Sequence, residues 1–203
     1  MLQFEGIRAD TLVLFERIRE NPFFNDFRLA GGTALALQIG HRLSIDLDFF
    51  VVQSAHFDQL NQEIEKLGRV RLIQSLNTIK SYVIEGIKVD FVNYAYPWIS
   101  EPIESEKYNL AGMEDIVAMK IAAITGRGSR KDFIDLYFLM QFYSTEQMMS
   151  YYKNKFKSAS LFLAFKSLIY FEDAEHEPMP EMLKPIDWDT VKLEIVSGFS
   201  ASH

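Results

Sequence analysis

The sequence contains no cysteine among its 203 residues. Disulfides, thiolate nucleophiles and zinc or iron–sulfur sites held by cysteine are therefore excluded. Long apolar runs are also absent, since none approaches the roughly 18 residues that a membrane-spanning helix needs. The N-terminus lacks the basic-then-apolar pattern of a signal peptide. We expect a cytoplasmic protein with no membrane partner.

An excess of positive charge is lacking as well, because the formal net charge is -7. General adhesion to nucleic acid depends on lysine and arginine, so this composition argues against it. The charge is unevenly spread, however: residues 120–157 are basic and residues 171–189 are acidic. A local basic patch can still bind a polyanion.

Apolar residues are abundant, at 48% of the chain, which is enough for a sizeable core. Hydrophobic periodicity and glycine or proline breaks predict helices over 10–20, 33–39 and 56–68 and strands over 26–30, 44–52, 70–76 and a hairpin over 79–94. A connector over 95–112 precedes helices predicted over 113–124, 130–143, 145–156, 158–171 and 187–199. This order predicts an α+β fold, with an α/β body over 1–95 and an α-helical half over 96–203.

Two carboxylates lie in the strand predicted over residues 44–52. Because side chains alternate along a strand, Asp46 and Asp48 share one face, about 7 Å apart. That separation suits a divalent cation such as Mg²⁺. Asp90 follows the same alternation in the predicted hairpin, and a neighbouring strand would bring it beside the other two. Three such carboxylates can clamp two metal ions.

Two glycines, Gly31 and Gly32, precede the short helix that begins at Thr33. A helix N-terminus offers unpaired N–H groups, and glycine lets a phosphate approach the backbone closely. We therefore expect Gly31, Gly32 and Thr33 to hold triphosphate oxygens. The spacing matches neither the P-loop nor the dinucleotide fingerprint. A Gly-Gly pair alone is typical of a turn, and a D-x-D alone of a solvent-facing strand.

Together, the Gly-Gly helix start, the D-x-D strand and the later aspartate resemble the DNA polymerase β-like nucleotidyltransferase superfamily. The segments GGTALAL and HRLSIDLDFF, with the pattern K-x6-R-x2-RKD-x2-DL that begins at Lys120, are similar to the AbiEii/AbiGii family of abortive-infection and toxin–antitoxin nucleotidyltransferases. The resemblance implies a nucleotidyltransferase-type mixed β-sheet with flanking helices. It also implies nucleotide transfer from an NTP with Mg²⁺ or Mn²⁺, an RNA acceptor such as tRNA, and a cognate antitoxin.

The resemblance also assigns roles in both halves of the chain. Arg42 and Ser44 match positions before the D-x-D strand, where Arg42 would bind phosphate or fix the aspartate face. Lys120, the expected main charge stabiliser, and Arg127 are two helical turns apart and share a face toward the triphosphate. Arg127 and Arg130 are placed in the nucleotide-binding set; alternatively, they simply cap a helix C-terminus and a helix N-terminus.

Asp132 and Asp135 are three residues apart and share a helix face. They would orient Arg or Lys partners or assist the incoming hydroxyl. Alternatively, Asp132 interacts with the helix dipole, and Asp135 is a structural partner of Arg42 or Lys131. His41 is expected to be a loop histidine and not a metal ligand, and His56, His176 and His203 show no metal-binding spacing.

One helix alternates aromatic and basic residues at Tyr151, Tyr152, Lys153, Lys155 and Lys157. Such a run is typical of an RNA-stacking surface, or of a half-buried amphipathic helix.

Two other functions compete with the RNA-modifying toxin. A non-catalytic nucleotide-binding interaction protein is disfavoured because the carboxylate set and Lys120 are present. A resistance-type transferase that modifies a small molecule would use the same first-half motif. The segment from Lys120 to Asp132 favours the toxin-like branch, by resemblance.

Overall fold

A computed structural model of the chain describes residues 1–53, 57–105 and 108–200. Its strands form one mixed sheet in the order β3-β4-β5-β2-β1-β7-β6. The strands are β1 (Arg28–Ala30), β2 (Leu47–Val52), β3 (Val70–Ser75), β4 (Ile79–Ile84), β5 (Ile87–Tyr94), β6 (Ile103–Ser105) and β7 (Tyr108–Leu110). The helices are α1 (Ala9–Glu20), α2 (Gly31–Ile39), α3 (Leu60–Ile64), α4 (Met113–Gly126), α5 (Arg130–Leu139), α6 (Thr145–Lys155), α7 (Leu161–Leu168), α8 (Glu172–Glu175) and α9 (Trp188–Ser200).

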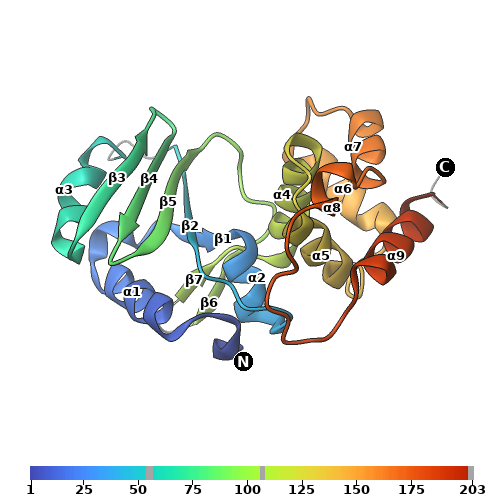
Figure 1. The fold of residues 1–203 in the computed structure, drawn as a ribbon. Helices are drawn as coiled ribbons and strands as arrows, with labels where there is room; N and C mark the ends of the chain where they lie inside the picture. Colours follow the sequence, from blue (N-terminus) through green and yellow to red (C-terminus); the bar gives the residue numbers. More distant parts are fainter. Residues whose placement is uncertain (54–56, 106–107, 201–203) are drawn as a thin grey trace.

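Figure 1 shows the sheet with α1 and α3 at one end of the molecule and the helices from α4 to α9 at the other, with α2 between them. The predicted α+β organisation, a sheet-containing body followed by helices, is therefore confirmed. None of the described helices has the length and apolar character required to cross a bilayer.

Strand β2 lies at the centre of the sheet, antiparallel to β1 and parallel to β5. Its alternation is as predicted, since Leu47 and Phe49 are fully buried while Asp48 lies on the opposite face. In the register of the sheet, Asp48 is paired with Ala30 on one side and Asp90 on the other. The expectation that a neighbouring strand brings Asp90 beside Asp48 is therefore confirmed.

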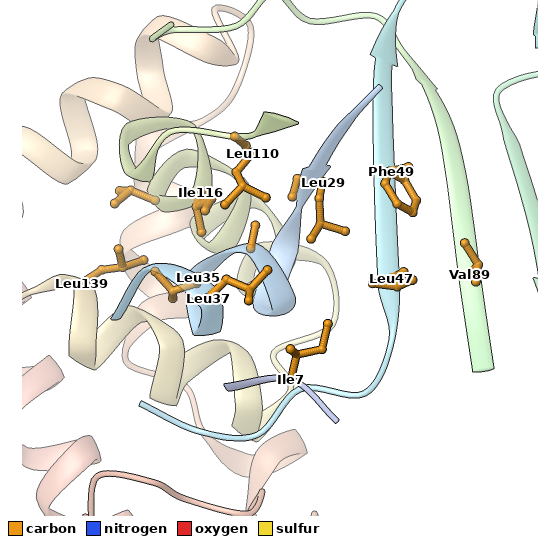
Figure 2. Packing of buried hydrophobic residues seen from close by; sticks show 14 of the residues in the cluster. Ile7, Leu29, Leu35, Leu37, Leu47, Phe49, Val89, Leu110, Ile116 and Leu139 are labelled. Carbon is orange, nitrogen blue, oxygen red and sulfur yellow. The ribbon is translucent and has the colours of Figure 1, made fainter. Parts of the chain in front are cut away.

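Helix α2 is apolar on all sides and must be covered on all sides. Leu35 and Leu37 are fully buried, and Figure 2 shows them between the strands and the helices that carry Ile116 and Leu139. Gly40, in the left-handed conformation (φ 59°), ends the helix as predicted. The Gly-Gly end of α2 is consequently held by packing along the whole helix.

The C-terminal part of the chain returns to the loop that precedes β2. The N–H of Leu43 donates to the carbonyl of Glu181 (2.8 Å), and the N–H groups of Leu183 and Lys184 both donate to the carbonyl of His41 (3.0 Å each). Arg42 and Met182 form an antiparallel bridge. Residues 181–184 are called the strap below.

Several predicted boundaries were wrong. Strand β2 begins at Leu47, three residues later than predicted, because Ser44 instead forms a bridge with Ile7. The predicted connector contains β6 and β7, and β7 pairs with β1, so the sheet continues beyond residue 95. The helix predicted over 56–68 is a short α3 flanked by 3-10 turns, and His56 lies outside the described residues. The domain boundary stays a prediction.

Candidate active site

A cavity of about 180 Å³ opens where α2 begins and β2 enters the sheet. Its walls come from the Gly-Gly start, the segment around the D-x-D motif, and the facing sides of α4 and α5. The lining residues are Gly31, Gly32, Arg42, Ser44, Asp46, Asp48, Phe50, Met119, Lys120, Ala123, Arg127, Lys131 and Asp132. The motifs that the sequence singled out therefore meet in one place.

The two glycines are required by close packing. Gly31 has φ 65°, and a Cβ there would lie 2.7 Å from Asp48 Oδ2. A Cβ at Gly32 would lie 2.1 Å from Arg42 Nη2. No side chain caps the first turn of α2 in the described structure. Its N–H groups are accordingly available to an anion.

Asp46 and Asp48 both line the cavity. Among the residues described, neither carboxylate has a hydrogen-bond or ion-pair partner. Burial, and next the charge of Asp90, raise the pKa of the Asp48 carboxyl above its usual value. Asp90 itself turns to Lys88 through Oδ2, and its Oδ1 is buried without a partner. Asp90 thus lies beside Asp48 in the sheet but outside the lining of the cavity.

These oxygen donors fit Mg²⁺ or Mn²⁺, both of which prefer carboxylates. The unpaired carboxylates of Asp46 and Asp48 and the unsatisfied Oδ1 of Asp90 are the atoms that a cation would satisfy. No three acidic or histidine side chains in the described ranges already converge on an ion site. Asp46 and Asp48 are therefore the pair that fits best, and Oδ1 of Asp90 is the atom that a third contact would use, since Lys88 is held by Oδ2.

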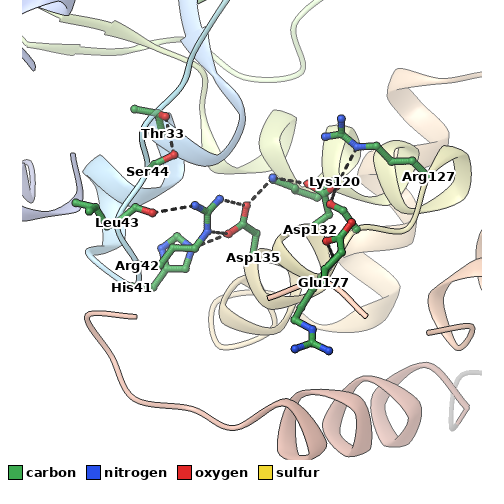
Figure 3. Close-up of polar contacts among 12 residues, drawn as sticks. Thr33, His41, Arg42, Leu43, Ser44, Lys120, Arg127, Asp132, Asp135 and Glu177 are labelled. Carbon is green, nitrogen blue, oxygen red and sulfur yellow. Dashed lines mark hydrogen bonds and ion pairs between the residues drawn. The ribbon is translucent and has the colours of Figure 1, made fainter. Parts of the chain in front are cut away.

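Asp135 is the centre of a buried network beneath the cavity (Figure 3). It accepts hydrogen bonds from Arg42 Nε (2.6 Å) and Nη2 (2.9 Å), and its Oδ2 pairs with Lys120 Nζ (2.5 Å). Burial alone would favour the neutral acid, but Arg42 and Lys120 hold the pKa of Asp135 well below its usual range. The predicted alternative, that Asp135 is a structural partner of Arg42, is the arrangement found.

Asp132 holds Lys120 from the other side, at 2.8 Å from Nζ. It also accepts from Ser129 Oγ (2.5 Å) and Arg127 Nε (3.3 Å). Burial opposes the charge of Lys120, but Asp135 and Asp132 together raise the pKa of its ammonium. Two buried cations, Arg42 and Lys120, are thus balanced by two buried carboxylates. The predicted orienting role of both aspartates agrees with this geometry.

His41 lies in the loop after α2, as predicted, and it is also a member of the buried network. It is fully buried, with Nε2 2.7 Å from Asp135 Oδ1 and its ring against Phe138. Since Asp135 can only accept, Nε2 carries the hydrogen, and Nδ1 is buried without a partner. Burial lowers the pKa of His41 despite the neighbouring Asp135. A second ring proton would find no acceptor.

Two predicted nucleotide-binding residues face elsewhere. Thr33 is 1% exposed, and its hydroxyl donates to the Asp46 carbonyl and contacts Ser44 Oγ (2.8 Å). It therefore fixes the D-x-D segment and does not face a phosphate. Arg130 does not line the cavity: it donates to the carbonyls of Ala174 (3.0 Å) and Glu175 (2.6 Å). The side chains of Thr33 and Arg130 thus hold neighbouring segments of the fold in place.

The predicted RNA surface on α6 was wrong for Lys155 and Tyr152, both of which are buried. Lys155 Nζ pairs with Asp115 (2.6 Å) and lies 4.8 Å from the centre of the Trp98 ring. Lys153 is exposed. The alternative prediction, a half-buried amphipathic helix, describes α6.

Lys131 lines the cavity, although the sequence analysis named it only as a possible partner of Asp135. It is exposed and has no ion-pair partner in the part of the chain that the structure describes. Its position next to Asp132 in the RKD motif was the one feature of the sequence that could have indicated a place in the cavity. Phe50, Met119 and Ala123 are apolar lining residues that no motif indicated.

Three comparisons place the chain among known proteins. Residues 12–201 match the family described as "Nucleotidyl transferase AbiEii toxin, Type IV TA system". An uncharacterised protein of Aquifex aeolicus (strain VF5), aq_aa25, is 41% identical over 184 residues, which cover 87% of this chain and 88% of that protein.

Two solved structures are similar over almost the whole chain. JHP933 from Helicobacter pylori has a TM-score of 0.58 at 19% identity, covering 97% of this chain and 93% of that one. MenT4, a nucleotidyltransferase toxin from Mycobacterium tuberculosis H37Rv, has a TM-score of 0.57 at 16% identity, covering 98% and 86%. At these identities the similarity concerns the fold, and the predicted fold class is confirmed.

Proposed function

Because the chain belongs to the AbiEii family of nucleotidyltransferase toxins, and is therefore a nucleotidyltransferase, we propose that it transfers the nucleoside monophosphate of an NTP to an RNA acceptor. One observation carries this proposal. The cavity joins an uncapped helix start, two unpaired carboxylates and a fixed pair of cations, one of which, Lys120, lies far from the other elements in the sequence. A triphosphate needs each of these elements.

The triphosphate would lie at the start of α2, where N–H groups and the helix dipole favour anions. Gly31 and Gly32 let the side chains of Asp48 and Arg42 come close to this helix start. Lys120 and Arg42 supply positive charge from fixed positions, because Asp132 and Asp135 hold them. Charge that is already oriented stabilises a transition state without reorganisation.

In the proposed reaction a hydroxyl oxygen of the acceptor attacks the α-phosphorus. A new P–O ester bond forms, the bond between the α- and β-phosphates breaks, and pyrophosphate leaves with the electron pair. The hydroxyl proton passes to solvent. Lys120 would stabilise the charge that develops on the departing phosphates.

Asp46 and Asp48 would hold the Mg²⁺ or Mn²⁺ that accompanies the NTP, with Asp90 as a third ligand. When bound, such an ion neutralises part of the triphosphate charge. A cognate antitoxin is proposed as a partner from family membership, since the family is described as part of type IV toxin–antitoxin systems.

Incubation of the purified chain with each α-labelled NTP, total RNA and Mg²⁺ tests the proposal. We expect labelled RNA from the wild type, and a turnover lower by about 100-fold or more for Lys120→Ala, the effect of removing one electrostatic stabiliser. Lys66→Ala, an exposed lysine that pairs with Glu63 and does not line the cavity, is the matched control and should be fully active. Label on protein or on a small molecule, with RNA unlabelled throughout, would refute the RNA acceptor.

A further inference from the structure

A second groove continues from the cavity. It has a volume of about 420 Å³ and lies between the loop that joins α4 to α5 and residues 177–180. Arg127 and Lys131 line both the groove and the cavity. The two spaces therefore share a cationic edge, and a ligand in the groove lies next to the Gly-Gly helix start.

The shared edge has free capacity for an anion. Lys131 is exposed and has no ion-pair partner among the described residues. The Arg127 side chain is 66% exposed and contacts Asp132 through Nε alone, which leaves both of its Nη groups for a ligand. A phosphate is the anion that suits a lysine and an arginine side by side.

The opposite wall is apolar. It consists of Pro178, Met179 and Pro180, and Met179 is 37% exposed. The one carboxylate in the groove, Glu177, accepts the Arg130 N–H at the start of α5 (2.8 Å). An apolar wall opposite a cationic edge matches a nucleotide, which has a flat base on one side and a phosphate on the other.

We propose that this groove binds the terminal nucleotide of a single-stranded RNA acceptor. Its phosphate lies against Arg127 and Lys131, its base against residues 178–180, and its free ribose hydroxyl points into the cavity. This inference rests on the proposed function and specifies where the acceptor enters. A single strand fits because an unpaired terminal base can leave its stack and contact the wall.

Binding of a short single-stranded RNA, labelled at its 5′ end with fluorescein, tests the inference by anisotropy without NTP. Met179→Asp puts a carboxylate against the ligand, and like charges weaken binding, so we expect about tenfold lower affinity. Leu193→Asp makes the same change at a residue of α9 that is 68% exposed, and should bind as the wild type does. NTP affinity should be unchanged in Met179→Asp, because Met179 does not line the cavity.

Lys131→Ala provides a second, independent measurement. Loss of one phosphate contact to a single strand lowers the slope of log affinity against log salt by about 0.7. Met179→Ala, which shortens the apolar wall without adding a charge, should lower the affinity but leave that slope nearly unchanged. The two variants thus separate the cationic edge from the apolar wall, and circular dichroism checks that each is folded.

RNA affinity that is equal in Met179→Asp and Leu193→Asp, with an unchanged salt slope in Lys131→Ala, would overturn the inference. Labelled RNA in the transfer assay would then show that the proposed function still holds. A labelled protein acceptor whose labelling falls in Met179→Asp would also overturn it, since the groove would then receive a protein. No RNA binding and no labelled RNA with the wild type would refute both proposals.

Discussion

Replacing Asp135 by Asn should destabilise the fold strongly, because Asp135 is the acceptor that Arg42, Lys120 and His41 share. The substitution keeps the shape of the side chain but removes its charge. It also turns a donor NH2 group toward partners that can only donate. Asp132 would then remain as the carboxylate partner of Lys120, while Arg42 would lose the one carboxylate that it contacts among the described residues.

The magnitude follows from the burial of the network, since Asp135 is 0% exposed and Arg42 is 4% exposed. Breaking a buried ion pair from one side costs about 3–5 kcal/mol, a large part of the roughly 5–15 kcal/mol by which domains are stable. For a chain of this length each kcal/mol shifts the melting temperature by about 2–4 °C. We therefore expect a decrease of about 6–20 °C.

Thermal and urea unfolding followed by circular dichroism measure this effect. Asp10→Asn is the matched control, because the Asp10 side chain is 50% exposed and pairs with Arg8 at the surface. It should melt with the wild type, since exposed pairs contribute little. A variant Asp135→Asn that also melts with the wild type would refute the reasoning that the network is held by its charge.

Three further predictions follow from the same structure. Asp48→Asn should abolish transfer but unfold at higher urea than the wild type at pH 7. Because the pKa of Asp48 is raised in the folded protein, its ionisation lowers the stability of the wild type at neutral pH. The difference in stability should vanish below about pH 4, where the carboxyl is neutral in both states. Burial lowers the pKa of His41 in the folded protein, so the unfolded chain binds the proton first and the wild type should lose stability as the pH falls below about 6.5. His41→Gln should not show this loss. Curves of stability against pH that run parallel for the two proteins between pH 7.5 and 5.5 would contradict this. Lys155→Ala should lower the free energy of unfolding in urea by about 3–5 kcal/mol, because it leaves the Asp115 carboxylate buried without its cation. A variant that is as stable as the wild type but binds RNA more weakly would instead support the predicted RNA-binding role of Lys155.

Local patterns in the sequence were sufficient for the part of the site that lies on β2 and α2. Alternation placed Asp48 and Asp90 on matching faces, and the parallel pairing of β2 with β5 put them side by side. Gly31 and Gly40 marked the two ends of α2 because each adopts a positive φ that other residues rarely take. These features depend on residues that are close in the chain or in neighbouring strands.

Contacts between distant segments were beyond the reach of periodicity. Asp135 and Arg42 are 93 residues apart, and their pairing was one of several predicted alternatives because no local pattern decides between Arg42 and Lys131 as the partner. Strand β7, at three residues, is too short for alternation to show, and it is recognisable only by its pairing with β1. Lys153 and Lys155 look alike in the sequence, and only the packing of α6 decides that Lys155 is buried.

The strap affects when the loop that carries Arg42, in the candidate site, can fold. Arg42 lies in a loop whose backbone partner, Met182, is 140 residues further along the chain. Contacts of such high sequence separation close late, because the entropy of a long loop must be lost before the contact forms. A refolding chain should therefore regain its sheet and α2 before it can bind NTP tightly. Nucleotide binding followed during refolding should lag behind the recovery of secondary structure, and removing the strap's hydrogen bonds should lengthen that lag.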